Sequence, residues 1–330
     1  MSKAFTHDLS TTYRWTYRYL RWVMVAALVA LFASVLIQSV VAGCWLGSVS
    51  AYYYTPARTV FVGGLIAFGA ALIAYKGRAP EEEVALNFAG YMAIIVAIVP
   101  TGESDTCIAT GFGQSREQVA DAVVNNIWSL LVTTAIVVAL VLSLRRHKDK
   151  NKVAPDTAAP VDAPREHSHK LAVVLSAVCI VVLVGELWYF LVRPEQFIER
   201  SHGIAALTMV FALVGVMVFN AWRVDHQEKL LGKWNYGIVY WVHAVVLVVL
   251  AAVVLAIQYF VPNDLLILTL ELIVFGVFIS YWILQSIELW GRDAEVQPSP
   301  SANQPNQTSP EPPPPNEARR SPAEQTEPAR

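Results

Sequence analysis

The stretch WVMVAALVALFASVLIQSVVAG, residues 22–43, contains no charged side chain and closely follows Arg14, Arg18 and Arg21. A helix needs about 20 consecutive apolar residues to cross a bilayer, because the hydrocarbon core is roughly 30 Å thick and each helical residue rises about 1.5 Å. Residues 22–43 are therefore long and apolar enough to form one membrane-spanning helix.

Seven further stretches are predominantly apolar and are assigned as membrane spans. They lie at residues 59–75, 84–100, 124–144, 171–192, 203–222, 236–260 and 265–287. The composition of the 330-residue chain agrees, since 55% of its residues are hydrophobic and 15% are charged, against about 25% charged in an average soluble protein. The sequence predicts an all-α polytopic membrane helix bundle of about eight transmembrane helices, and it excludes an ordinary cytosolic enzyme.

Basic residues are distributed unevenly between the loops that join these stretches. Loops rich in Lys and Arg stay cytoplasmic, and an N-terminus placed inside puts 20 of the 24 basic residues on the cytoplasmic side. The sequence therefore predicts that both termini are cytoplasmic. The lipid bilayer is the partner that composition implies, whereas a net charge of −2 offers no basic surface for nucleic acid.

Three segments are predicted to lie outside the membrane. Residues 1–21 form an N-terminal segment, and residues 145–169 form a cytoplasmic linker between membrane helices 1–4 (22–144) and 5–8 (170–290). Residues 291–330 carry ten prolines among polar residues. Such a composition buries too little apolar surface to offset the entropy of ordering, so we expect a disordered tail, whose proline runs could bind a partner protein.

One loop on the predicted outer side is dense in hydroxyl groups. It reads SVSAYYYTPARTVFVG over residues 48–63. Tyrosine rings can lie at the lipid headgroups with their hydroxyls in water, and Arg58 could hold a lipid phosphate or a carboxylate in a forked pair. Alternatively, the loop is an interfacial turn in which Arg58 pairs with an acid of the loop. The candidate ligand-binding residues here are Ser48, Ser50, Tyr52, Tyr53, Tyr54 and Arg58.

Glu186 and Glu271 are the acids inside the predicted spans, where a charge is costly unless it is paired or faces a polar cavity. Each lies about six residues from the outer end of its span, and His202 lies at a similar level. A stripe at helical spacing, Glu271, Phe275, Phe278, Trp282, Gln285 and Leu289, is predicted to face the bundle interior. We therefore expect an outward-facing polar pocket that includes Glu186, His202 and Glu271 and binds or moves a small molecule or lipid.

Two other interpretations stay open. If the glutamates are hydrogen-bonded structural groups, the protein is a structural or scaffold membrane subunit. If His202 and carboxylates hold a metal-bound water, it is an intramembrane metal-dependent lipid hydrolase. Metal hydrolases normally need three protein ligands, and the chain has no HExxH, GxSxG or Walker motif. No catalytic residue, metal ligand or cofactor is therefore predicted, and we expect a protein that is not an enzyme.

The three cysteines divide between the outer side and the membrane. Cys44 and Cys107 fall in predicted outer loops, so they could form a disulfide bond. The sequence VAGC at residues 41–44 also matches a lipoprotein cleavage pattern, but the apolar run before it exceeds the usual 7–15 residues of a signal core. A retained first helix is therefore favoured. Cys179 is expected to be a packing residue within the membrane.

The segment 48–63 resembles a pattern, S-x-S-x-Y-Y-Y-T-P-x-R-x-x-F-V-G, that is shared by a family of actinobacterial-type polytopic membrane proteins. Further similar segments are IAYKG at 73–77, VPT at 99–101, HGIAA at 202–206 and the run from Trp282 to Trp290. The resemblance implies a multi-pass protein of the bacterial cytoplasmic membrane, and it brings no known activity with it.

Overall fold

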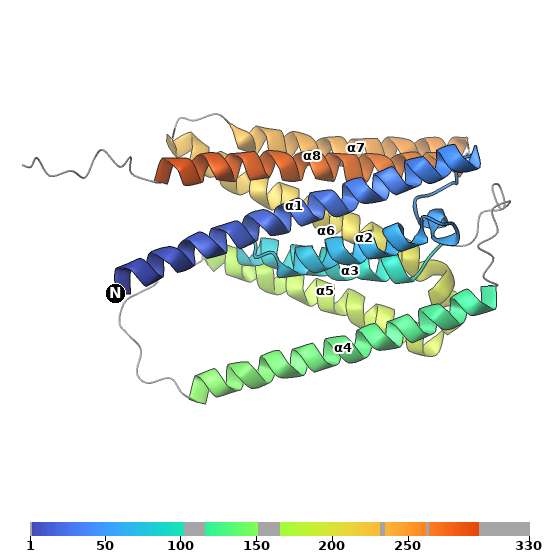
Figure 1. Cartoon of the computed structure of the whole chain (residues 1–330), viewed down its shortest axis with the longest axis horizontal. Coiled ribbons are helices and arrows are strands. Elements are labelled where there is room, and N and C mark those ends of the chain that lie inside the picture. The colour runs from blue at the N-terminus through green and yellow to red at the C-terminus, as the bar shows by residue number, and fades with distance from the viewer. Residues whose placement is uncertain (1, 102–115, 151–165, 232–234, 262–263, 297–330) are drawn as a thin grey trace, which may run out of the picture. The chain divides into compact units, whose positions relative to one another are not determined.

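The computed structural model describes residues 2–101, 116–150, 166–231, 235–261 and 264–296. Figure 1 shows that these ranges are helical, and none of them contains a strand. The elements are α1 (Ser2–Ala42), the 3-10 helix η1 (Ser50–Tyr54), α2 (Arg58–Ala74), α3 (Pro80–Ile98), α4 (Arg116–Lys150), α5 (Glu166–Val192), α6 (Pro194–Leu231), α7 (Tyr236–Phe260) and α8 (Asp264–Val296). The prediction of an all-α fold is confirmed.

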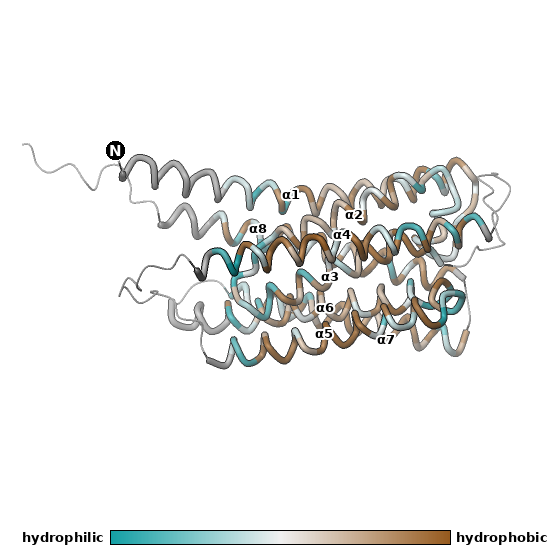
Figure 2. The backbone as a smooth tube through the Cα atoms, turned by 90° about the horizontal axis from the view of Figure 1, so that it is seen from below, coloured by the Kyte–Doolittle hydropathy of each residue, from teal (hydrophilic) through white to brown (hydrophobic). Residues whose placement is uncertain are grey.

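Six of the helices are long and apolar enough to cross a membrane. The qualifying segments are Trp15–Ala42, Gln118–His147, Ser168–Val192, Pro194–Val224, Tyr236–Phe260 and Leu265–Trp290. Apolar residues fill the middle of these helices, and hydrophilic residues gather toward their ends (Figure 2). This distribution is the one that a bilayer imposes on a multi-pass membrane protein.

The helices α2 and α3 are shorter, with 17 and 19 residues. Figure 1 shows them side by side, and α3 also packs against α5 and α6. Their backbones approach closely where Gly69 of α2 meets Gly90 of α3, because a Cβ atom built on either glycine would lie 2.5 Å from the carbonyl oxygen of the other. Only glycine therefore fits this contact, which joins the two helices into one tightly packed hairpin.

Several helices extend beyond the apolar stretches from which they were predicted. Helix α1 begins at Ser2, α4 continues to Lys150, α5 begins at Glu166 and α8 continues to Val296. The segment 145–169, predicted as a cytoplasmic linker, therefore begins and ends in helix. Lys, Arg, Glu and Gln favour helix, and a helix satisfies its own backbone, so nothing forces these helices to stop at the bilayer boundary.

The chain divides into two compact units, residues 1–288 and residues 289–330. The helix packing and the candidate sites all lie in the first unit. The centre of the predicted linker, 151–165, and most of the predicted disordered tail, 297–330, lie outside the described residues.

The interior of the first unit is aromatic along one side of α8. Phe275, Phe278, Trp282 and Gln285 are buried, as their helical spacing predicted. Phe278 stacks on Trp282 with ring centroids 5.4 Å apart, and it meets the edge of Phe68 in α2 at the same distance. Because the stripe carries Glu271 toward one end and Gln285 toward the other, aromatic rings separate two polar regions of the bundle.

Candidate functional site

The chain between α1 and α2 folds back into the ends of the helices. We call this end of the bundle the outer end, after the predicted topology, and the opposite end the inner end. Gly43 begins the loop with φ +68°, a left-handed conformation that glycine adopts without strain. Tyr52 and Tyr53 of η1 are only 1% and 2% exposed. The expectation that these tyrosines lie at the headgroups with hydroxyls in water was therefore wrong.

Hydroxyl groups attach the loop to neighbouring protein instead of to water. The Tyr52 hydroxyl hydrogen-bonds to Ser39 of α1, and the Tyr54 hydroxyl donates to the carbonyl of Thr101 at 2.9 Å. Ser50 Oγ lies 2.9 Å from Thr101 Oγ1 and 3.0 Å from Ser48 Oγ. The hydroxyl-rich motif thus fastens the loop to α1 and to the chain after α3.

Arg58 lies against the tyrosines of the same loop. Its guanidinium carbon is 4.1 Å from the centroid of the Tyr53 ring, and Nη2 donates to the Tyr53 hydroxyl at 2.5 Å. The stacking is a cation–π contact, which also orients the guanidinium at the first residue of α2.

Glu271 joins α8 to this loop. The backbone N–H of Val49 donates to Glu271 Oε2 at 2.5 Å, and the N–H of Leu268 donates to the carbonyl of Gly47 at 2.9 Å. The Glu271 side chain is only partly buried. A carboxylate has about four acceptor positions, and Val49 fills one of them within the part of the chain that the structure describes.

Glu186 lies beside Ser201 of α6. The residue is 8% exposed, and neither Glu186 Oε2 nor Ser201 Oγ has a hydrogen-bond partner among the described residues. The carboxylate is therefore enclosed between helices with unused acceptor capacity.

His202 closes the end of α3. Its Nδ1 lies 2.6 Å from the carbonyl oxygen of Val99, and the ring also interacts with the carbonyl of Val96. The Val96 carbonyl lacks its usual intrahelical donor because the residue four positions later, Pro100, has no N–H. His202 thus caps a helix end that the proline leaves open.

The predicted pocket residues fall into two groups. The loop residues from Ser48 to Arg58 meet one another and Glu271, whereas Glu186 and His202 contact α6 and α3. Within the described residues no hydrogen bond or ion pair links Glu186, His202 and Glu271 to one another, so a shared pocket stays a prediction. No group of three or more His, Cys, Asp or Glu side chains in those residues could hold a metal ion.

Two of the three cysteines lie among the described residues. Cys44 is disulfide-bonded, and Cys179 is a buried free thiol. Cys107, the partner predicted for Cys44, lies outside the described residues.

A second polar group lies at the inner end, and the sequence analysis did not assign it. We call it the inner-end cluster. Its members come from α1, the α2–α3 turn and helices α3, α6, α7 and α8, and they are Arg21, Tyr75, Arg78, Glu82, Asn220, Tyr240, Tyr281, Trp282, Gln285, Ser286 and Glu288.

An ion pair between Arg78 and Glu288 forms the centre of this cluster. Arg78 Nη2 lies 2.9 Å from Glu288 Oε2 and Nη1 lies 3.4 Å from Oε1, while the Tyr240 hydroxyl donates to Oε2 at 2.5 Å. Burial alone would lower the pKa of the Arg78 guanidinium, but the adjacent Glu288 carboxylate outweighs it and raises that pKa above its ordinary value. The Arg78 guanidinium therefore keeps its charge beside Glu288.

Glu82 links the start of α3 to α6. Its Oε2 accepts the backbone N–H of Arg78 at 2.8 Å, and its Oε1 accepts Asn220 Nδ2 at 2.8 Å. Asn220 Nδ2 also reaches the Tyr281 hydroxyl at 3.0 Å. An acid in the first turn of a helix is stabilised by the helix dipole, so Glu82 both suits the start of α3 and bridges it to the preceding turn and to α6.

Arg21 completes the cluster from α1. Its guanidinium carbon lies 4.8 Å from the Tyr75 ring centroid and 5.1 Å from that of Trp282, and it donates to the Tyr75 hydroxyl and to Ser286 Oγ. A separate ion pair lies nearby in sequence, with Arg223 Nη2 2.7 Å from Glu81 Oε1. The inner end is thus fastened by charges of both signs.

Comparisons of the chain with models of protein families, with curated proteins and with solved structures gave no match in any of the three. The chemistry of the chain's own residues must therefore carry a functional proposal.

Proposed function

We propose that the protein is a non-enzymatic multi-pass protein of the bacterial cytoplasmic membrane that binds or moves a small molecule or lipid at its outer end. The proposal includes eight spans with both termini inside, and α2 and α3 are then a hairpin that crosses within the bundle. The positive-inside distribution and the buried contact between α2 and α3 support this topology. The resemblance to an actinobacterial-type family agrees with it and adds no activity.

The uncompensated carboxylates in the outer half carry the proposal. Glu271 has one backbone donor, Glu186 Oε2 has none, and neither forms an ion pair within the described residues. An ionisable group within a span is costly, so it is usually retained for binding, ion passage or proton transfer. Free acceptor positions on carboxylates favour a solute with a cationic or hydrogen-bond-donating group.

The outer loop has the position of a cover over Glu271. It is fastened to α8 through the Val49–Glu271 and Leu268–Gly47 hydrogen bonds. A ligand group that replaced the Val49 N–H would free the loop from the carboxylate. In the inner-end cluster, by contrast, the Glu288 carboxylate is paired with Arg78. This asymmetry favours a site that is reached from the outer side.

A scaffold role is the second candidate, and a specific observation favours it. The hydroxyls of Tyr52, Tyr54 and Ser50 are satisfied by protein groups, which is what a purely structural loop would require.

Labelling with dicyclohexylcarbodiimide, an apolar reagent that modifies protonated carboxyl groups within membranes, tests the proposal. In native membranes, peptide mapping by mass spectrometry should find the adduct on Glu271 and not on Glu288, whose carboxylate is held by Arg78. Tetramethylammonium added from outside should protect Glu271. An unlabelled Glu271, or equal labelling of Glu288, would contradict an accessible and uncompensated outer carboxylate and would leave the scaffold role.

A further inference from the structure

The inner half of α4 is left uncovered by the rest of the bundle. The Tyr91 hydroxyl of α3 lies 3.3 Å from Thr134 Oγ1. From residue 135 to residue 147 every side chain of α4 is exposed. Because Gln118–His147 is one of the membrane-length segments, this uncovered half lies where lipid surrounds the protein.

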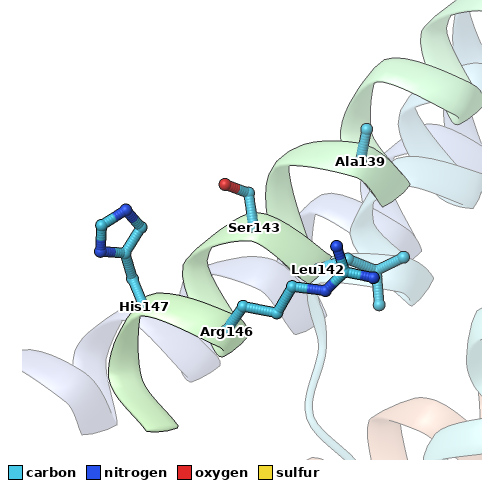
Figure 3. Close-up of a pocket in the computed structure, with 5 residues that line it drawn as sticks. All are labelled: Ala139, Leu142, Ser143, Arg146 and His147. Atoms are coloured by element: carbon cyan, nitrogen blue, oxygen red, sulfur yellow. The ribbon is translucent and has the colours of Figure 1, made fainter. Parts of the chain in front are cut away.

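An open cavity of about 430 Å³, lined by exposed side chains of this one helix, lies on this part of α4 (Figure 3). Its lining residues are spaced three and four apart and so share one side of the helix: Ala139, Leu142, Ser143, Arg146 and His147. The side chain of Arg146 extends toward Leu142, and Ser143 and His147 lie on the adjoining strip of the helix (Figure 3). The cavity therefore has an apolar part toward the membrane and a polar, basic part at the end of the span.

We infer that this cavity binds the phosphate headgroup of an anionic phospholipid, with the acyl chain along Leu142 and Ala139. A guanidinium offers a phosphate two parallel hydrogen bonds. Basic residues that directly follow a span on the cytoplasmic side meet the leaflet that carries anionic lipid. The cavity takes a lipid and not free phosphate because Ala139 and Leu142 give its lining an apolar part that an acyl chain can cover.

The charge of the neighbouring sequence agrees with this occupant. Residues 145–150 read RRHKDK, so the segment at the end of the span is strongly basic. The inference rests on the proposed topology, which places this end of α4 on the cytoplasmic side, and not on the outer carboxylates, so the lipid test and the labelling of Glu271 can fail separately.

Native mass spectrometry of the full chain tests the inference. The protein is released from nanodiscs made of equal parts of phosphatidylcholine and phosphatidylglycerol, and the retained lipids are counted. The variant is Arg146→Gln. The matched control is Arg145→Gln, which removes the same charge one residue away, at a position that does not line the cavity. Both positions are exposed, so both variants should fold, and circular dichroism verifies this.

Retained phosphatidylglycerol should exceed phosphatidylcholine in the unmodified protein. Loss of hydrogen bonds to a charged phosphate should lower its retention by about tenfold or more in Arg146→Gln. Arg145→Gln should lower it by no more than about fivefold, the contribution of one basic residue near an anionic surface. Equal losses in the two variants, or no preference for phosphatidylglycerol, would overturn the inference. Displacement of the lipid by inorganic phosphate would overturn it as well, because the site would then take free phosphate.

Discussion

Replacing Gly69 with alanine should separate α2 from α3. A Cβ atom at this position would lie 2.5 Å from the carbonyl oxygen of Gly90 and 3.0 Å from Cγ1 of Ile94. The carbonyl oxygen belongs to the backbone, so it cannot rotate away as a side chain could. The helices would have to move apart by about 0.9 Å to restore an ordinary 3.4 Å contact. Overpacking of a dense interior costs about 1–3 kcal/mol. A clash between an added Cβ atom and a backbone carbonyl belongs at the upper end of that range.

The matched control is Gly63→Ala in the same helix, where nothing lies within 4 Å of the added Cβ. Alanine is favoured over glycine within a helix by about 1 kcal/mol, so Gly63→Ala should stabilise by up to about that amount. Gly69→Ala gains the same helix propensity of about 1 kcal/mol but loses about 3 kcal/mol to overpacking. It should therefore be destabilised by about 2 kcal/mol.

Unfolding of the purified variants in mixed dodecylmaltoside and SDS micelles, followed by tryptophan fluorescence, measures both effects. Equal stability of the two variants would refute the close contact between α2 and α3, and with it the packed hairpin within the bundle. A third variant, Gly90→Ala, should be destabilised as much as Gly69→Ala, because its Cβ would lie 2.5 Å from the carbonyl oxygen of Gly69.

Three further predictions concern the inner end, the cap and the tail. Arg78→Gln and Glu288→Gln should each cost about 3–5 kcal/mol of unfolding free energy, the double variant should cost less than their sum, and the control Glu83→Gln should change little. Because the folded pKa of Arg78 is raised above an already high value, its stabilisation is fully present below the unfolded pKa, so the cost of Arg78→Gln should be the same at about pH 7 and pH 10 in denaturant titrations. His202→Leu should cost about 1–3 kcal/mol, since it leaves carbonyls of α3 unpaired, and His202→Gln should restore part of this in the same titrations. Truncation after Val296 should leave the melting temperature in detergent unchanged, and a large decrease would show that the tail packs on the bundle.

The fold was predictable because a membrane limits the choices. Backbone groups in hydrocarbon must be satisfied within the segment, so a long apolar run has little alternative to a helix. The stripe on α8 from Phe275 to Gln285 was predictable for the same reason, since helical spacing fixes which side chains share a side. Helix ends were not predictable, because α1 and α4 continue through polar residues that favour helix as strongly as the apolar ones do.

The candidate site was predicted less completely. Glu271 was identified because an acid inside an apolar run is conspicuous in a sequence. The path of the loop was missed, since a tyrosine suits a lipid interface and a buried loop equally well, and only packing places Tyr52 inside. Arg78 and Glu288 were missed because Arg78 lies in a turn and Glu288 just after a predicted span, where charged residues are ordinary, and 210 residues separate them. Segments 73–77 and 282–290, which belong to the resemblance described in the sequence analysis, contain several residues of the inner-end cluster. They were the only hint of the cluster in the sequence.

The two ends of the bundle differ in how their acids are compensated. At the inner end Glu288 has Arg78 and Glu81 has Arg223, while Glu82 accepts two hydrogen bonds, from the backbone N–H of Arg78 and from Asn220 Nδ2. A paired buried ion is a poor guide to function, because its attraction is largely offset by the cost of taking both charges out of water. At the outer end Glu271 has a single backbone donor and no ion pair within the described residues, so its cost is not repaid by the fold. This difference in the compensation of the acids is why we propose the outer end, and not the inner-end cluster, as the place where a ligand supplies a missing partner.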